Sequence, residues 1–238
     1  MFAEDRMRMD GTRAQTGVAV RTLIQNVYLW MAVGLGVTGF VSLSVLSNRG
    51  ILQAIVGTPG LLMALIIGEL VLVGFLSFRI QRMSPQTAFG VFLGYSALNG
   101  LTLAPIFLIY TETSIASTFF ITAGMFGAMA LYGVTTKRDL QAFGSYFFMA
   151  LIGLILASVV NLFLRSDALG WLISFVGVFL FLGLTAYDNQ RIASWSSRMS
   201  GQEGSADYQR LSVIGALRLY LDFINLFLFL LRFLGRRR

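Results

Sequence analysis

The chain has 238 residues, of which 56% are hydrophobic and only 12% charged, and its formal net charge is +7 at pH 7. This composition excludes an ordinary soluble globular protein and predicts a membrane protein. The absence of cysteine and histidine excludes disulfides, thiolate zinc sites, Cys–His nucleophilic pairs and imidazole pH switches. Any proton or cation chemistry must therefore depend on carboxylates.

The N-terminal segment, residues 1–24, is polar and carries mixed charges. No short apolar core with a small-residue cleavage site precedes the first long apolar run, so we expect no cleaved signal peptide. We predict a cytoplasmic tail at 1–24, a single seven-helix membrane domain at 25–234 and a basic C-terminal tail at 235–238.

Seven apolar runs are long enough to cross a bilayer, whose core of about 30 Å takes roughly 20 helical residues. They do not alternate polar and apolar residues as strands of a membrane barrel would, so the predicted fold is an all-α polytopic membrane protein. Pro105 is expected to kink or end the third run. In chain order the predicted spans are 25–47, 60–78, 87–109, 115–134, 142–164, 170–190 and 214–234.

The distribution of Lys and Arg among the loops predicts the orientation of the chain. The tail and alternate loops carry eleven basic residues, whereas the intervening loops carry two, so the N-terminus is predicted to be cytoplasmic. This pattern explains the positive charge better than nucleic-acid binding does. Arg232 and the closing residues 235–238 are exceptions. Either the seventh helix crosses against the rule, or it re-enters the membrane and returns.

Three acids lie inside the predicted spans: Glu69, Asp188 and Asp222. A charged side chain at membrane depth costs about 2.5–3.5 kcal/mol, so each needs a partner or a water-filled cavity. In the seventh span, polar residues recur at steps of four and three around Asp222, which places them on one helical face. A polar face on a membrane helix avoids lipid, so we expect the other helices to surround the seventh one.

Asp188 and Asp222 are candidates for a carboxylate pair, because consecutive antiparallel helices are expected to be neighbours. If the seventh helix enters the membrane near Ala216, Asp222 lies about 9 Å deep, and Asp188 matches that depth only if the sixth helix continues to about Ser194. Two adjacent carboxylates cannot both ionise cheaply, so they would share a proton and are predicted to titrate near physiological pH. Deprotonated, they would offer oxygen ligands suited to Ca²⁺.

A purely structural interpretation of these acids stays open. Arg218 lies four residues before Asp222 and could neutralise it within the helix, and Asp188 could accept bonds beside Arg191. Glu69 could be buried against an arginine of a neighbouring helix as well as contribute to a permeation path.

Two segments resemble signatures of a known family. They are LTAYDNQRI at 184–192 and LRLYLDFINLFLFLLRFLG at 217–235, with a weaker likeness in GLTLAPIFLIY at 100–110. The chain resembles the Bax inhibitor-one (transmembrane Bax-inhibitor-motif) family in its bacterial branch. The resemblance implies seven transmembrane helices with the last one central, a pH-sensitive calcium leak, and location in the bacterial cytoplasmic membrane.

The resemblance also implies roles for individual residues. The family's di-aspartyl pair carries over to Asp188 and Asp222, and its helix-two glutamate carries over to Glu69. An arginine near the end of helix two contacts the pair in the family. Arg79 is the nearest match here, although its register is off by one residue, and a positive-inside anchor is its other interpretation.

We therefore expect a calcium-permeable leak channel, not an enzyme, gated by protonation of Asp188 and Asp222, with Arg79 and Arg218 as gating residues. Glu69 is a candidate third acid for the ion. The expected partners are the lipid bilayer and calcium ions, as permeant or bound ion, with no resident cofactor and no nucleic acid.

Two alternatives remain. One is a non-transporting membrane-protein partner that regulates quality control or a stress response. The other is an intramembrane aspartyl protease. Two features of the sequence argue against it: the second acid follows in LYLD, where such enzymes have Gly-x-Gly-Asp, and no Pro-Ala-Leu comes after it.

Overall fold

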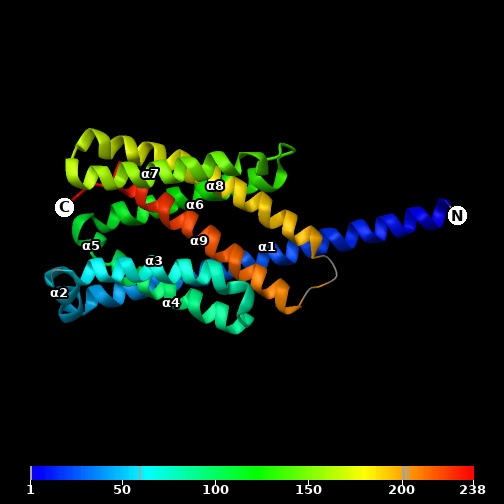
Figure 1. Ribbon diagram of the computed structural model, residues 1–238, viewed down its shortest axis with the longest axis horizontal. Coiled ribbons are helices and arrows are strands. Elements are labelled where there is room, and N and C mark those ends of the chain that lie inside the picture. The colour runs from blue at the N-terminus through cyan, green and yellow to red at the C-terminus, as the bar shows by residue number, and fades with distance from the viewer. Residues whose placement is uncertain (1, 59, 200–201, 203) are drawn as a thin grey trace. The chain divides into compact units, whose positions relative to one another are not determined.

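A computed structural model describes residues 2–58, 60–199, 202 and 204–238 of the chain (Figure 1). In these residues the backbone is helical almost throughout, and the only strand-like pairing is one isolated bridge. The helices are α1 (Phe2–Ser47), α2 (Arg49–Gly57), α3 (Leu61–Arg79), α4 (Pro85–Leu103), α5 (Ile106–Ile109), α6 (Glu112–Thr135), α7 (Gly144–Leu164), α8 (Asp167–Arg198) and α9 (Ala206–Leu234), with 3-10 turns η1 (Ile80–Arg82) and η2 (Gln141–Phe143).

Within the described residues, seven helical segments are long and apolar enough to cross a membrane, as predicted. The segments are Thr22–Ser47, Leu61–Arg82, Pro85–Ile109, Glu112–Thr135, Gln141–Leu164, Asp167–Arg198 and Ala206–Leu234. The prediction of an all-α polytopic membrane protein is therefore confirmed. The helices extend beyond the predicted bounds into polar sequence: α1 begins at Phe2 rather than at residue 25, α8 continues past residue 190 to Arg198, and α9 begins at Ala206 rather than at residue 214.

Local sequence signals explain several helix ends. The Ser84 hydroxyl accepts a hydrogen bond from the Thr87 amide at 3.1 Å, and Pro85 occupies the first position of α4. The third span is interrupted beside Pro105, as predicted, because α4 ends and the short α5 follows. Helix α2, which was not predicted, starts where the Asn48 side chain accepts bonds from two backbone amides.

The chain divides into two compact units. Unit 1 comprises residues 1–105 and 192–217, and unit 2 comprises residues 106–191 and 218–238. The unit boundaries fall inside α8 and α9, so each of these two helices contributes one part to each unit.

In unit 1, α1 lies along α4 (Figure 1) and is joined to it by hydroxyl groups. Thr38 Oγ1 donates to the Ser96 carbonyl at 2.9 Å, and Ser42 Oγ donates to the Gly100 carbonyl at 2.8 Å. A Cβ at Gly100 would lie 2.7 Å from the Thr38 carbonyl oxygen, so glycine allows this close approach.

In unit 2, the second part of α9 packs against α6 and α8 through aromatic rings. Phe223 lies edge-on to both Phe119 and Phe126 of α6, with ring centroids 5.4 and 5.5 Å apart. Phe229 of α9 stacks on Phe181 of α8 at 5.8 Å. These contacts hold the second part of α9, which carries Asp222, within the unit.

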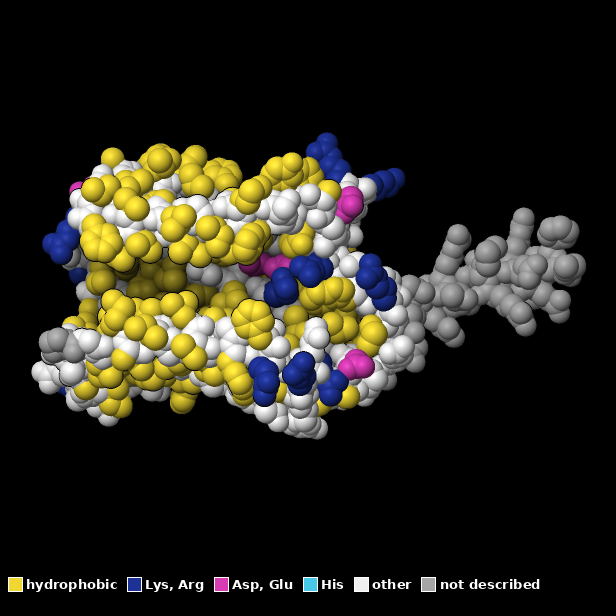
Figure 2. Space-filling view, viewed as in Figure 1, with side chains coloured by type: hydrophobic (Ala, Val, Ile, Leu, Met, Phe, Trp, Pro, Cys, Tyr) yellow, Lys and Arg dark blue, Asp and Glu magenta, His cyan; other side chains and the backbone are white. Residues whose placement is uncertain are grey.

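The spans differ sharply in burial. In both α3 and α7 only 6% of the most apolar stretch is buried, and hydrophobic side chains cover much of the visible surface (Figure 2). Such uninterrupted apolar surface is suited to lipid. In α9, by contrast, 67% of that stretch is buried, against 44% or less in each other span. The last helix is thus the most buried one, in agreement with the expectation from its polar face.

Candidate functional site: a buried carboxylate pair with arginine

Asp188 and Asp222 both lie in unit 2, and each is only 5% exposed. Helix α8 continues beyond Ser194, which is the condition that the sequence set for Asp188 to reach the depth of Asp222. The two carboxylates are close enough to repel each other electrostatically. The structure therefore brings together the two acids that the sequence singled out.

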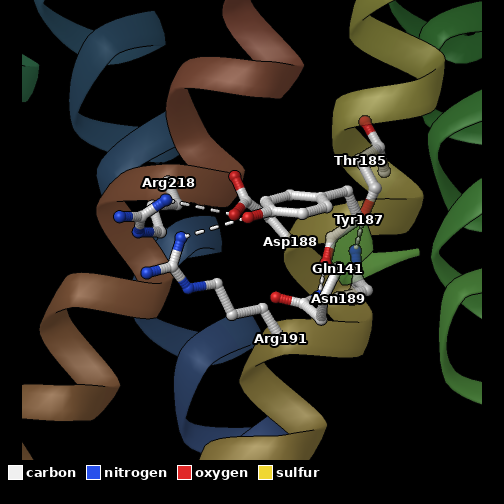
Figure 3. Close-up of polar contacts among 7 residues, drawn as sticks. All are labelled: Gln141, Thr185, Tyr187, Asp188, Asn189, Arg191 and Arg218. Carbon is white, nitrogen blue, oxygen red and sulfur yellow. Dashed lines mark hydrogen bonds and ion pairs between the residues drawn. The ribbon is translucent and has the colours of Figure 1, made fainter. Parts of the chain in front are cut away.

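Arg218 joins this pair. Its Nη1 donates to Asp188 Oδ1 at 3.1 Å, from α9 to α8 (Figure 3), and its charge also attracts Asp222. The side chain of Arg218 is 37% exposed, whereas that of Asp188 is 7% exposed. The guanidinium thus extends from the surface of the unit to a carboxylate that is almost fully buried.

The second carboxylate is less well satisfied. Asp222 Oδ2 is buried and accepts no hydrogen bond from the residues that the structure describes. A buried carboxylate oxygen without a donor is costly, so this atom is suited to take up a proton or a cation. One arginine ion pair cannot neutralise two carboxylates, which leaves the Asp188, Asp222 and Arg218 cluster with one negative charge when both acids are ionised.

Arg191 adds a further positive charge beside the site. It attracts Asp188 electrostatically, and its Nη1 donates to the Tyr187 hydroxyl at 3.4 Å. In Figure 3 the side chains of Arg191 and Arg218 both extend toward the Asp188 carboxylate and the Tyr187 hydroxyl. The sequence suggested an intrahelical Arg218–Asp222 pair, but the ion pair that the geometry defines is the one to Asp188 between two helices.

The segment around Asp188 has a second role that the sequence analysis missed. Gln190 Oε1 accepts from the Leu140 amide at 2.8 Å, and Gln190 Nε2 donates to the Arg138 carbonyl at 2.7 Å. Gln141 Nε2 donates to the Tyr187 carbonyl at 3.3 Å. In this turn of α8, Asp188 binds Arg218 of α9, and the adjacent residues Tyr187 and Gln190 bind the connection between α6 and α7. The signal in the sequence that could have indicated this role is Gln190, a glutamine two residues after Asp188.

The other predicted site residues lie in unit 1. Glu69 on α3 is half-buried, and its Oε1 accepts a hydrogen bond from Thr102 Oγ1 of α4 at 2.5 Å. The partner is thus a threonine rather than the arginine that the sequence suggested. Arg79 is exposed in the last turn of α3, and its contact with the aspartate pair stays a prediction.

No group of three or more acidic side chains in the described residues is arranged to hold a metal ion. The oxygen ligands at the aspartate pair therefore come from two carboxylates. A divalent ion there would need further oxygen ligands, such as water molecules, because Ca²⁺ takes six to eight.

The fold and the buried charged cluster define a class, a polytopic α-helical membrane protein with ionisable residues inside its spans. Residues 20–238 match the family model described as inhibitor of apoptosis-promoting Bax1, and the chain belongs to this Bax inhibitor-one-like family. The resemblance noted from the two sequence signatures is thereby confirmed over nearly the whole chain.

Similar proteins occur in distant bacteria. The chain is 47% identical over 234 residues to the inner membrane protein YbhL of Escherichia coli, covering 98% of this chain and all of that one. It is 43% identical over 231 residues to a protein of Borreliella burgdorferi that carries no functional name, covering 97% and 99% of the two chains. A membrane protein of Streptococcus pyogenes is 38% identical over 224 residues, or 93% and 96% of the two chains.

Proposed function

We propose that this protein is a pH-sensitive, calcium-permeable leak channel, whose gate is the cluster of Asp188, Asp222 and Arg218. The observation that carries the proposal is the Asp222 carboxylate, which is buried beside a second acid and has an oxygen without a hydrogen-bond donor in the described residues. Ionisable groups inside a membrane protein are functional by default, because they are costly to keep there.

The mechanism is a two-state equilibrium controlled by protonation. When both acids are ionised, Arg218 pairs with Asp188 and attracts Asp222, and Arg191 attracts Asp188 as well. The Asp222 oxygen that has no hydrogen-bond donor in the described residues is then the atom that attracts a cation. When the pair takes up a proton, the attraction for Arg218 and for the cation weakens. The conformation that binds protons more tightly is then favoured as the pH falls.

We place the protein in the bacterial cytoplasmic membrane with its N-terminus in the cytoplasm. The asymmetry of Lys and Arg among the loops supports this orientation, and the name of the similar Escherichia coli protein supports the location. Glu69 is the candidate third acid for the ion, and Arg79 the candidate arginine from the second span.

The test is calcium influx into liposomes that contain the purified protein and a calcium dye, measured from pH 5 to 8. We expect influx above that of empty liposomes, with a pH dependence that Asp222→Asn removes. Asp207→Asn is the matched control, because Asp207 lies on the same helix but is 73% exposed in a pair with Arg210. Influx no greater than in empty liposomes would contradict the proposal and favour the non-transporting partner.

A further inference from the structure

Arg232 is an exception to the distribution of basic residues that the aspartate cluster leaves unexplained. It is exposed in the last turn of α9, and it lies over Gly170 in the first turn of α8, because a Cβ at Gly170 would be 2.7 Å from Arg232 Nη2. The side-chain amide of Asn161 on α7 reaches the same point, since Asn161 Nδ2 would be 3.2 Å from that Cβ. Two nitrogen donors from different helices of unit 2 therefore converge beside α8.

These two donors have no acceptor. Asn161 Oδ1 accepts from the Ser166 amide at 3.0 Å, which fixes the orientation of the side-chain amide and leaves Nδ2 as the atom beside Arg232. Among the residues that the structure describes, neither Asn161 Nδ2 nor the Arg232 guanidinium has a hydrogen-bond acceptor or an ion-pair partner. A guanidinium has five donors and no acceptor, and its planar fork fits the oxygen atoms of a phosphate.

The neighbouring charges also favour an anion. Arg165 and Asp167 flank the start of α8, and their charges oppose each other. Beyond Arg232, the exposed Arg236 and Arg237 add positive charge, and neither forms an ion pair in the described part of the chain. The amide of Arg236 donates to a serine hydroxyl of α6 at 2.8 Å, so the tail is held at this end of unit 2.

An exposed row of aromatic rings begins beside the two donors and follows α8. Trp171, Phe175 and Phe179 recur at steps of four residues, with ring centroids 5.3 and 5.0 Å apart. Phe233, the residue after Arg232, contacts Trp171 at 5.7 Å and Phe175 at 6.3 Å. Between 39% and 61% of each of these four residues is exposed, although all four lie in membrane spans. This aromatic row is suited to contact with hydrocarbon.

Donors for a phosphate that adjoin an apolar row match an amphipathic ligand. Trp171 directly follows Gly170, so the two parts are contiguous, and a tryptophan at the end of a span is typical of the headgroup level. A soluble anion would leave the aromatic row unused, whereas a phospholipid would use both parts, and basic sites between membrane helices bind lipid headgroups. We propose that Arg232 and Asn161 bind the headgroup phosphate of an anionic phospholipid, one of whose acyl chains lies along the aromatic row.

This site shares no residue with the aspartate cluster and does not depend on the calcium leak. Its test is the thermal unfolding of the purified full chain in detergent, titrated with phosphatidylglycerol, with phosphatidylcholine of the same acyl chains, or with inorganic phosphate. A ligand that binds only the folded state raises the melting temperature. We expect phosphatidylglycerol to act at a concentration at least about tenfold lower than either other probe. Equal action of the two lipids, or of phosphatidylglycerol and inorganic phosphate, would overturn the proposal.

Two substitutions test the donors. Arg232→Gln removes the cation, and Asn161→Asp retains the oxygen that accepts from the Ser166 amide but replaces the donor by an oxygen that repels phosphate. We expect each to abolish the preference for phosphatidylglycerol over phosphatidylcholine. Arg49→Gln is the control, because Arg49 is exposed at the start of α2 and its loss changes the net charge equally. A preference that survives both substitutions would contradict the assignment.

Gly170→Ala tests the site without a change of charge. The added Cβ would displace the flexible end of Arg232, so we expect the lipid preference to be lost while the fold is kept. Gly127→Ala is its control, because a Cβ there meets nothing within 4 Å. An equal preference in the two variants would overturn the role of the convergent donors.

Phe179→Ala tests the apolar part of the site. It shortens the aromatic row far from the donors, so both lipids should bind more weakly while the preference between them remains. No stabilisation of the wild type by either lipid, together with a smaller particle size in solution for Phe179→Ala, would overturn the proposal and assign the aromatic row to a second copy of the chain.

Discussion

Arg218 lies one helical turn before Asp222 in the sequence, yet its Nη1 donates to Asp188 Oδ1 of another helix at 3.1 Å. The guanidinium therefore ties α8 to α9 at the depth of the two buried acids. This ion pair between helices responds to protonation of Asp188, because the charge that binds Arg218 then disappears. This relationship makes the stability of the helix pair depend on pH.

We predict that Arg218→Gln lowers the stability of the protein by about 1–3 kcal/mol at pH 8, because the buried Asp188 then loses its ion pair and Asp222 loses the attraction of the Arg218 charge. Breaking a fully buried pair costs about 3–5 kcal/mol, and the partial exposure of Arg218 reduces this value. The difference from wild type should shrink as the pH falls to 5, since protonated acids no longer need the arginine. Thermal unfolding of the variant and of the wild type at pH 5 and pH 8 measures this difference in stability.

The control for this experiment is Arg238→Gln. Arg238 pairs with Glu112, and both side chains are well exposed, so we expect a change of about 0–1 kcal/mol. A penalty for Arg218→Gln that is the same at pH 5 and pH 8 would contradict the assignment of Arg218 to the titrating pair.

Gln190 is predicted to hold the connection between α6 and α7. Gln190→Ala removes both bonds to the 138–140 backbone, so the Leu140 amide should exchange its hydrogen faster by at least about tenfold. Hydrogen-exchange mass spectrometry of the peptide covering 136–143 checks this. Gln209→Ala is the control, because Gln209 is exposed and its side chain donates to the nearby Gly204 carbonyl, away from the 138–140 backbone. Unchanged exchange in Gln190→Ala would show that the connection is held by other contacts.

Two glycines of α6 make a matched pair for helix packing. A Cβ at Gly133 would overlap the carbonyl oxygen of Ala186 on α8, whereas a Cβ at Gly127 would meet nothing within 4 Å. We expect Gly133→Ala to lower stability by about 1–3 kcal/mol through overpacking. Gly127→Ala should be neutral or slightly stabilising, because alanine favours helix. Equal effects of the two substitutions would argue against this close approach of α6 and α8.

The C-terminal residues are bound to the connection between α5 and α6. Arg238 N donates to the Ile109 carbonyl at 2.9 Å, Thr111 N donates to the Arg236 carbonyl at 3.2 Å, and Tyr110 pairs with Arg237 in a β-bridge. Helix α9 is continuous and long enough to cross a membrane, and its described residues contain no break of the kind that a re-entrant segment would need, so we predict that the seventh span crosses. Because of these contacts, we predict that the C-terminus lies on the same side of the membrane as this connection.

The absence of cysteine allows a direct check of this topology. We predict that Arg238→Cys and Thr113→Cys react with a membrane-impermeant maleimide from outside intact cells, whereas Asp139→Cys, at the other end of α6, reacts only after the membrane is opened. Labelling of Arg238→Cys from the side that labels Asp139→Cys would contradict the crossing of α9.

Hydropathy predicted the seven spans because each apolar run must match the bilayer, and Pro105 marked the break in the third. It could not predict how far α8 and α9 extend into polar sequence, since polar helical residues carry no membrane signal. That extension decides whether Asp188 reaches the depth of Asp222. The hydrogen-bond partners of Glu69 and Gln190 could not be predicted from the sequence either, because contacts between helices depend on how each helix is rotated about its own axis.

The measurement that tests the central claim most directly is calcium influx from pH 5 to 8 for wild type, Asp188→Asn, Asp222→Asn and the double variant, with the stability of each measured alongside. A shared titration predicts that each single substitution abolishes the pH dependence equally and that the double variant adds nothing further. Independent, additive effects of the two substitutions, or a pH dependence that survives in the double variant, would contradict the account.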